Sequence, residues 1–415
     1  MSWPLRPVSE LCEFAVDCVN KTAPVVAQET PYKMIRTTNV KGGFIDIKDV
    51  RYVSKDTFEK WTRRSRPQFG DVILTREAPV GEVGRCTFPE DEKIFLGQRL
   101  FHFRADPSKL DWNFLAYALQ SAEVQGRLHG RSFGATVPHV KVGDAESLLI
   151  PCPPLDEQRR IGGVLANYDD LIATNQRRIT LLEDAARLLY REWFVHLRFP
   201  GHEGKILNSG LPIEWKKGTA YDFVLVLSGG TPKTSMTDYW EGDIPFFTPK
   251  DSPDAFYAID TEKHLTESGL ASCNSGLYPR NTIFITARGT VGKVALAQRP
   301  MAMNQSCYAL APRLPYDTYF LFLAIREAVE HFKQVAVGGV FDAIVVDTFK
   351  IIPFLLPPEA LTRQFGELVK PMFEQLEKLL LQNRGLAQAR DLLLPKLMSG
   401  QLDVSSIALP DEVLT

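Results

Sequence analysis

Residues 155–193 read LDEQRRIGGVLANYDDLIATNQRRITLLEDAARLLYREW, and this stretch decides the fold. Apolar side chains and one asparagine recur along it at alternating steps of four and three residues: Ile161, Leu165, Tyr168, Ile172, Asn175, Ile179, Leu182, Ala186, Leu189 and Trp193. That spacing is the a/d seam of a coiled coil, sustained over about five heptads. At about 1.5 Å per residue the helix is roughly 60 Å long. It is too long for one small domain, so we predict that it lies along a partner helix.

The residues before this helix mark its start. Pro153 and Pro154 end the preceding segment, and Asp156 and Glu157 lie in the first turn, where the helix dipole favours acids. An ordinary buried core helix also carries an amphipathic stripe, but the length of this seam favours the coiled coil. Asn175 at a seam position would cost stability and fix the register of the paired helices.

The partner helix is expected in the same chain. A second, poorer seam repeats the four-three spacing at Phe365, Val369, Met372, Leu376, Leu379, Asn383, Leu386, Arg390, Leu393 and Leu397. Each residue lies 204 positions after its counterpart, as Phe365 does after Ile161. Pro357-Pro358 repeats the lead-in, and Pro371 inside the helix predicts a kink.

Length and composition set the class of protein. A chain of 415 residues is too long for one core, and its 45% apolar and 24% charged residues are typical of a globular protein. No apolar run reaches membrane-spanning length and no signal pattern opens the chain, so we expect a cytoplasmic protein. The cysteines are scattered, without a CxxC pair, and favour free thiols over disulfides or zinc: Cys12, Cys18, Cys86, Cys152, Cys273 and Cys307.

Charge gives no global signal for nucleic acid. The net charge is −2, and the globular segments are nearly balanced in charge, so any nucleic acid must bind local patches.

Residues 1–150 read as an α+β domain with short strands between glycine-rich turns and one helix at Trp112–Val124. Residues 199–204 have the composition of a linker, 205–355 form a second domain, and the tail after Gly400 has no periodicity and is expected to fray.

The second domain repeats the first. The segment DVILTREAPVGEV at 71–83 matches TIFITARGTVGKV at 282–294, and Gly97-Gln98 matches Asn304-Gln305. WNFL at 112–115 matches YFLF at 319–322, and MIRTTN at 34–39 aligns with FFTPK at 246–250. The predicted order is globule, long helix, globule, long helix, which is an internal duplication of half the chain.

These motifs resemble those of the specificity subunit of type I restriction-modification systems, over essentially the whole chain. The resemblance rests on PPLDEQRRI at 153–161, LLYREWF at 188–194, SGGTPK at 228–233, IPFFTPKD at 244–251 and LLLPKLMSG at 392–400. It implies an α+β fold of two duplicated target-recognition domains held apart by two long antiparallel helices. The corresponding segments are 1–152 and 199–356 for the domains, 153–198 and 357–400 for the helices, and 401–415 for the tail.

The resemblance also implies a function. Each target-recognition domain would read one half of a split double-stranded DNA sequence, and modification (methyltransferase) subunits would dock on the helices. Those subunits use S-adenosylmethionine to methylate adenine, and restriction (motor and nuclease) subunits use ATP and Mg. The chain itself would hold no cofactor.

Motifs for intrinsic catalysis are missing from the sequence. Cys152-Pro153-Pro154-Leu155 and Leu356-Pro357-Pro358-Glu359 lack the polar and aromatic residues of an adenine methyltransferase turn. Neither a GxGxxG nor a GxxxxGK[ST] phosphate-binding loop occurs, and no HExxH pair suggests a metal site. A nuclease site at Asp254 with Glu262 and Lys263, or at Asp46 with Lys48, has unconvincing spacing, and we interpret these residues as surface charges. No catalytic or metal-binding residue is therefore predicted.

Candidate DNA contacts are polar residues in loops that also contain glycine or proline. In the first domain they are Arg36, Thr38, Asn39, Lys41, Arg76 and Arg131. In the second they are Thr231, Lys233, Thr248, Lys250 and Arg288. Such side chains read bases and phosphates, and their recurrence in both halves favours a function over ordinary turns. The basic run at 60–66 fits phosphate binding and a solvated helix end almost equally.

A second class of function fits the same architecture. A protein–protein adaptor built on a coiled coil would also have two domains and two long helices. The motif-level resemblance favours the DNA-specificity function over the adaptor.

Overall fold

The computed structural model describes residues 3–19, 21–130, 139–204, 207–208, 211–313, 315–335 and 343–407. The chain divides into two compact units: unit 1 contains residues 1–172 and 385–415, and unit 2 contains residues 173–384. Within the described residues, no helix has the length and apolar character needed to cross a membrane.

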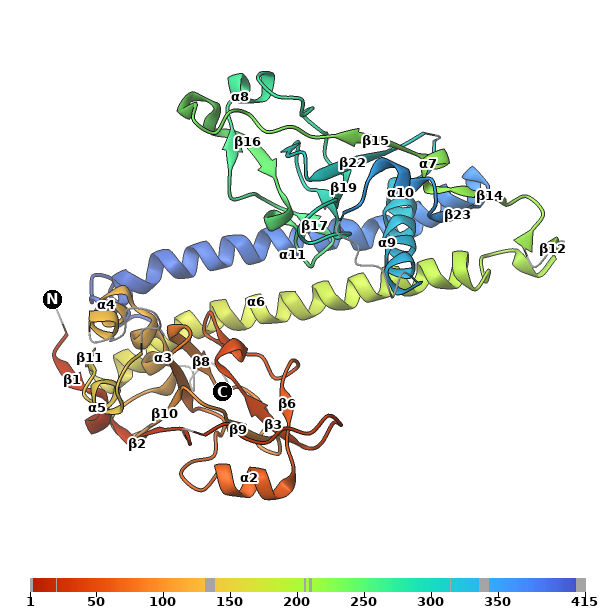
Figure 1. The fold of residues 1–415 in the computed structure, drawn as a ribbon. Helices are drawn as coiled ribbons and strands as arrows, with labels where there is room; N and C mark the ends of the chain where they lie inside the picture. Colours follow the sequence, from red (N-terminus) through yellow and green to blue (C-terminus); the bar gives the residue numbers. More distant parts are fainter. Residues whose placement is uncertain are drawn as a thin grey trace. The chain divides into compact units, whose positions relative to one another are not determined.

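Both predicted long helices are present. Helix α6 spans Leu155–Tyr190 and continues into a π-helical turn at Arg191–Val195, and α11 spans Glu359–Met398 (Figure 1). Each helix contributes one part to each unit. In unit 1 Asp169 of α6 pairs with Arg390 of α11, and in unit 2 the Trp193 and Phe365 rings lie 5.5 Å apart. Asp169 precedes Trp193 in the chain, but its partner Arg390 follows Phe365, the partner of Trp193. The two helices therefore run antiparallel.

The seam positions are covered to different degrees. The buried ones are Ile161, Leu165, Asn175, Ile179, Ala186, Trp193, Phe365, Val369, Leu376, Leu379 and Leu397. The half-buried ones are Tyr168, Ile172, Leu182, Leu189, Met372, Asn383, Leu386, Arg390 and Leu393. Much of this burial comes from the globular part of the same unit, since Ile161 and Leu165 belong to the unit 1 core. Helix α11 runs through Pro371 without interruption, and the kink stays a prediction.

Unit 1 is built on an antiparallel sheet. Its strand order is β2 (Cys12–Asp17), β10 (Leu100–Ala105), β7 (Val72–Arg76) and β8 (Val80–Arg85). A second sheet has the order β6 (Arg51–Tyr52), β3 (Tyr32–Ile35) and β9 (Lys93–Leu96). Two further pairs are β1 (Leu5–Pro7) with β11 (Leu149–Pro151), and β4 (Val40–Lys41) with β5 (Phe44–Ile45).

Short helices complete unit 1. They are α1 (Val8–Leu11), η1 (Thr37–Asn39), α2 (Lys55–Trp61), α3 (Trp112–Gln120), α4 (Ala122–Gly130) and α5 (Val142–Glu146). The apolar face of α3 packs with the central sheet and with the first part of α6 in one hydrophobic core.

Unit 2 repeats this plan. Its central sheet has the order β15 (Val224–Ser228), β22 (Cys307–Pro312), β19 (Ile283–Thr286), β20 (Val294–Ala297) and β17 (Tyr257–Ala258). The second sheet has the order β18 (His264–Leu265), β16 (Trp240–Phe247) and β21 (Ala302–Met303). The remaining pairs are β14 (Lys216–Thr219) with β23 (Pro353–Leu356), and β12 (Leu207–Asn208) with β13 (Leu211–Pro212).

The shorter helices of unit 2 are η3 (His202–Gly204), α7 (Ala220–Phe223), η4 (Thr237–Tyr239), η5 (Pro249–Asp251), α8 (Glu267–Ala271), α9 (Thr318–Val335) and α10 (Val346–Phe349). Most of them have a counterpart in unit 1, whereas η3 and η4 have none among the described residues.

The predicted duplication is confirmed at the level of strand register. Leu74 pairs with Val83 in unit 1, and their sequence counterparts Ile285 and Val294 pair in unit 2. The parallel pairing of β3 with β9 through Ile35 and Leu96 recurs between β16 and β21. Equivalent residues therefore have equivalent places in the two sheets.

Two local predictions were wrong. The single helix at Trp112–Val124 is two helices, because Ser121 takes an extended backbone conformation (φ −62°, ψ 144°) and ends α3 at Gln120. The first part of the tail is packed: Val404 is buried in the unit 1 core, and Arg160 Nε donates to the Ile407 carbonyl at 2.7 Å. Burial of an apolar side chain therefore holds this segment in place, although its sequence has no helical or strand periodicity.

A close approach between helices is also duplicated. Asp111 caps α3, where its Oδ1 accepts from Phe114 N at 2.8 Å, and a Cβ at Gly162 of α6 would lie 2.6 Å from that oxygen. In unit 2, Asp317 accepts from the first N–H groups of α9, and a Cβ at Gly366 of α11 would collide with its carboxylate. Only glycine permits each contact, because any Cβ would occupy the position of the capping carboxylate.

A buried carboxylate fixes the globular part of unit 1 on the long helices. Asp169 of α6 is fully buried and accepts from Tyr117 Oη at 2.5 Å, from Arg85 Nη2 at 3.4 Å and from Arg390 of α11. Arg85, whose side chain is 2% exposed, also donates to Asn113 Oδ1 at 2.9 Å. Burial raises the pKa of Tyr117, so its hydroxyl stays a donor.

Unit 2 has aromatic packing at the same place. Phe373 lies 204 residues after Asp169, and the β20 residue equivalent to Arg85 is Leu296; both are fully buried. The Phe373 ring lies 5.4 Å from Phe256 and 4.3 Å from Tyr319. One duplicated joint is therefore ionic and the other apolar.

We predict that Asp169→Asn destabilises unit 1. The change leaves two arginines without their buried counter-ion, and breaking such a network costs about 3–5 kcal/mol. Urea unfolding would give the free energy, and hydrogen exchange would assign the loss to unit 1. Asp170→Asn is the control, because that side chain is 66% exposed and 3.6 Å from Arg85; its cost should stay below about 1 kcal/mol. Equal costs would contradict the buried network.

Candidate nucleic-acid interface

Four of the five candidates in unit 2 line one hollow. Thr231 follows β15, Thr248 precedes the η5 turn after β16 and Lys250 lies within that turn, and Arg288 follows β19. The hollow has a volume of about 430 Å³, and Asn304 from the loop after β21 also lines it. Loops that are far apart in the sequence thus present polar side chains to one space.

Local hydrogen bonds hold these loops in place. Asp251 caps η5: its Oδ2 accepts from Thr248 N at 2.8 Å and from Thr248 Oγ1 at 2.6 Å. The hydroxyl of Thr231 donates to Gln305. Gly229 lies directly against the backbone of Met303 and Asn304, where no Cβ fits. Packing of the chain inside unit 2 thus explains the first glycine of the SGGTPK motif at 228–233.

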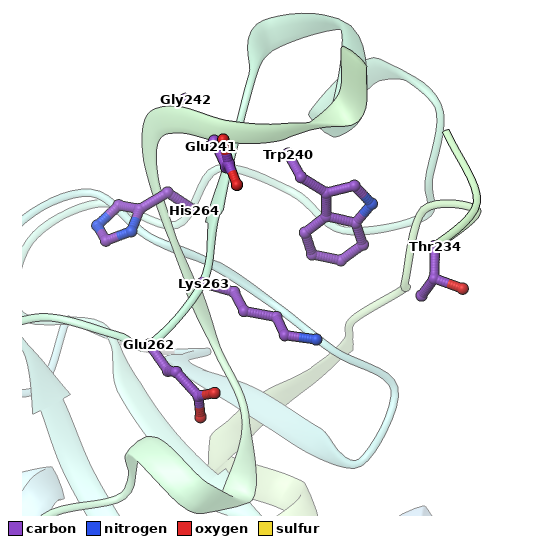
Figure 2. Close-up of a pocket in the computed structure, with 7 residues that line it drawn as sticks. All are labelled: Thr234, Trp240, Glu241, Gly242, Glu262, Lys263 and His264. Carbon is purple, nitrogen blue, oxygen red and sulfur yellow. The ribbon is translucent and has the colours of Figure 1, made fainter. Parts of the chain in front are cut away.

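A second hollow adjoins the first. It has a volume of about 580 Å³ and shares Thr234, Trp240, Glu262 and Lys263 with the other. Figure 2 shows Lys263 extending beneath the Trp240 ring, and its Nζ lies 5.4 Å from the ring centroid. Trp240 Nε1 donates to the Lys233 carbonyl at 3.4 Å. Lys233 itself is exposed beside the hollow and does not line it.

The lysine and arginine side chains that line the hollows form fewer ion pairs than two nearby basic side chains of unit 2. Lys293 pairs with Asp254 at 2.7 Å, and Arg299 pairs with Asp260 at 2.9 Å. Burial would raise the pKa of Asp260, but the Thr261 N–H and the guanidinium groups on it hold that pKa at about 2. In the described part of the chain, Lys250, Lys263 and Arg288 form no ion pair with a carboxylate, so they are available to an external anion.

The candidates in unit 1 are placed differently. Arg36 and Arg76 have carboxylates 3.7 Å away, on Asp49 and Asp17, while Thr38 and Lys41 are exposed. Arg131 lies outside the described residues. The unit 1 candidates that remain open to a ligand are therefore Thr38 and Lys41.

The prediction for Asn39 does not fit the structure. Its side chain is 3% exposed, its Oδ1 accepts from Arg36 N at 2.9 Å, and its Nδ2 donates to the carbonyls of Asp46 and Asp49. Asn39 has the same capping role as Asp251 in unit 2, so it shapes the loop and cannot reach a base. Arg36-Thr37-Thr38-Asn39 does not match the Ser/Thr-x-x-Glu/Gln capping signature, so this cap has no signal in the sequence.

Part of the basic run at 60–66 has structural partners. Arg64 pairs with Asp17 at 2.6 Å, and Arg66 donates to the Glu92 carbonyl at 3.4 Å. Lys60 and Arg63 are exposed.

Sequence reasoning missed Trp240 and Asn304, and it interpreted Glu262 and Lys263 as surface charges, although all four line the hollows.

Comparison with known proteins identifies the class. The family model described as "Type I restriction modification DNA specificity domain" matches residues 2–184 and 212–382, once in each half of the duplication. The chain belongs to this family. It is a specificity subunit of a type I restriction-modification system, a DNA-recognition component that is not itself catalytic.

Individual relatives agree with this assignment. The chain is 24% identical over 365 residues to the MjaIX specificity subunit from Methanocaldococcus jannaschii, covering 86% of this chain and 83% of that protein. It is 22% identical over 416 residues to the MjaX specificity subunit from the same organism, described as putative, covering 97% and 94%. The crystal structure of the S subunit from M. genitalium matches with a TM-score of 0.60 at 18% identity, over 96% of each chain, and supports the fold.

We predict that Lys250→Ala and Arg288→Ala each weaken DNA binding and lower the salt dependence. Each lost phosphate contact should reduce the slope of log K against log salt by about 1. Fluorescence anisotropy of the assembled complex with labelled duplex, over a range of salt, would measure the slope. Arg198→Ala removes the same charge from a side chain paired with Glu192 at 2.5 Å and should leave the slope unchanged. Equal effects in all three variants would indicate only a general effect of net charge.

Proposed function

We propose that this chain reads a bipartite DNA target, with the globular part of unit 1 recognising one half-sequence and that of unit 2 the other. The observation that carries the proposal is the duplication of the sheet, in the same register, with equivalently capped turns after β3 and β16 that carry candidate contact residues. Each unit also has its own hydrophobic core. Two independent readers on shared helices recognise two short sequences separated by a spacer that neither contacts.

The proposed partners are double-stranded DNA, modification subunits and restriction subunits. The long helices expose leucines that are apolar and uncovered in this chain: Leu171, Leu181, Leu188, Leu368, Leu381 and Leu392. Modification subunits that dock there would bury them. In this proposal the modification subunits bring S-adenosylmethionine, the restriction subunits use ATP and Mg, and the assembly works in the cytoplasm, where chromosomal DNA lies.

We predict that exchanging residues 1–150 for those of a relative with a different target changes one half-site only. The graft must keep an arginine and a tyrosine at positions 85 and 117, because Asp169 stays on the recipient helix and needs both donors. Single-molecule sequencing of DNA methylated by the assembled complex would give both half-sites. The reciprocal exchange of residues 205–355 is the control and should change the other half. A swap that rewrites both half-sites, or an uninterrupted target, would contradict the division.

We predict that the purified chain alone transfers no methyl group to DNA. Labelled S-adenosylmethionine incubated with the chain and DNA should leave the DNA unlabelled, and adding modification subunits should start the transfer. Labelling that persists with the chain alone, after a second purification step, would refute the non-catalytic assignment.

A further inference from the structure

Glu262 occupies an unusual place for an acid. It lines both hollows of unit 2 together with Lys263 and Trp240. The basic side chains around this space favour a polyanion, whereas a free carboxylate repels one. An exposed acid in such a position costs affinity for DNA unless it makes a favourable contact there.

The backbone on both sides of this residue is fixed. Glu262 N donates to Asp251 Oδ1 at 2.7 Å, on the cap that organises the η5 turn. The preceding Thr261 is buried, and its Oγ1 accepts from Phe246 N at 3.0 Å and donates to the Lys263 carbonyl at 2.7 Å. Glu262 is therefore anchored to the same turn that presents Thr248 and Lys250.

The side chain itself has no internal role. Within the described ranges its carboxylate takes part in no hydrogen bond or ion pair, whereas the Asp251 carboxylate accepts three. In Figure 2 Lys263 extends beneath the Trp240 ring, the Glu262 side chain lies below Lys263, and the neighbouring His264 points away from the Trp240 ring. Glu262 thus presents an acceptor that is unused by the fold at the edge of the candidate interface.

We propose that Glu262 reads a cytosine in the half-site recognised by unit 2, an inference that rests on the proposed function. An ionised carboxylate only accepts hydrogen bonds, and the groove edge of cytosine offers the N4 amino donor without an adjacent acceptor. Adenine also carries an amino group, but its neighbouring N7 is an acceptor that would face the second carboxylate oxygen. The negative charge therefore selects cytosine and disfavours adenine.

The amide variant separates recognition from charge. Glu262→Gln keeps the shape of the side chain and adds a donor, and glutamine pairs with adenine through N6 and N7. We expect the wild-type complex to require cytosine at one position of this half-site. The variant should methylate cytosine sites about 10- to 100-fold more slowly, as for one mismatched pair, and accept adenine there. The other half-site should be unchanged.

The experiment uses the full chain assembled with its modification subunits and a library of randomised duplexes, with methylated sequences read by single-molecule sequencing. Glu267→Gln is the matched control, an exposed acid of unit 2 that lines neither hollow; its target should equal that of the wild type. The inference is overturned if Glu262→Gln binds all duplexes more tightly with an unchanged target, as removal of a solvated charge would cause. It is also overturned if the affected wild-type position is adenine. A wild-type target without a split would instead reject the proposed function.

Discussion

The attachment of each globular part to the long helices is the constraint on which the rest of this structure depends. In unit 1 it centres on Asp169, a buried carboxylate that receives hydrogen bonds from Tyr117 on α3, Arg85 on β8 and Arg390 on α11. One anion thereby fixes three elements. A buried charge tolerates little displacement, because every lost partner leaves an uncompensated ion. The network thus specifies one orientation of the sheet on the helices of unit 1.

Duplication has kept the geometry of this joint while changing its chemistry. Phe373 replaces Asp169 in unit 2, and its ring packs among Phe256, Phe322 and Tyr319. Apolar packing is less directional than an ion pair, but it gains stability from the removal of area from water. The capping aspartate against a helix glycine is conserved in both copies, as Asp111 with Gly162 and Asp317 with Gly366. In both units the contact between aspartate and glycine thus sets how closely the short helix approaches the long one. An ionic network stabilises the joint in unit 1, and aromatic packing stabilises it in unit 2.

The same division applies to the loops. The cap formed by Asn39 in unit 1 and by Asp251 in unit 2 fixes the turn after the equivalent strand. The basic side chains near these turns and after the central strands differ: Arg36 and Arg76 of unit 1 are half-buried beside carboxylates, whereas Lys250 and Arg288 in unit 2 form no ion pair with a carboxylate among the described residues. A stable frame with variable side chains allows two copies of one fold to recognise different ligands.

The sequence by itself determined the order of the elements, the two long helices and the duplication. Those features depend on local periodicity and on similarity between distant segments, which a single chain displays directly. The tertiary structure alone decided which polar residues are free. Asn39 has an amide that could contact a base, but in the structure its amide is hydrogen-bonded to backbone groups. Glu262 was interpreted from the sequence as a surface charge, whereas in the structure it lines a hollow together with Trp240 and Lys263. The physical reason is that hydrogen-bond partners and burial come from residues far apart in sequence, so availability to a ligand has no local signal.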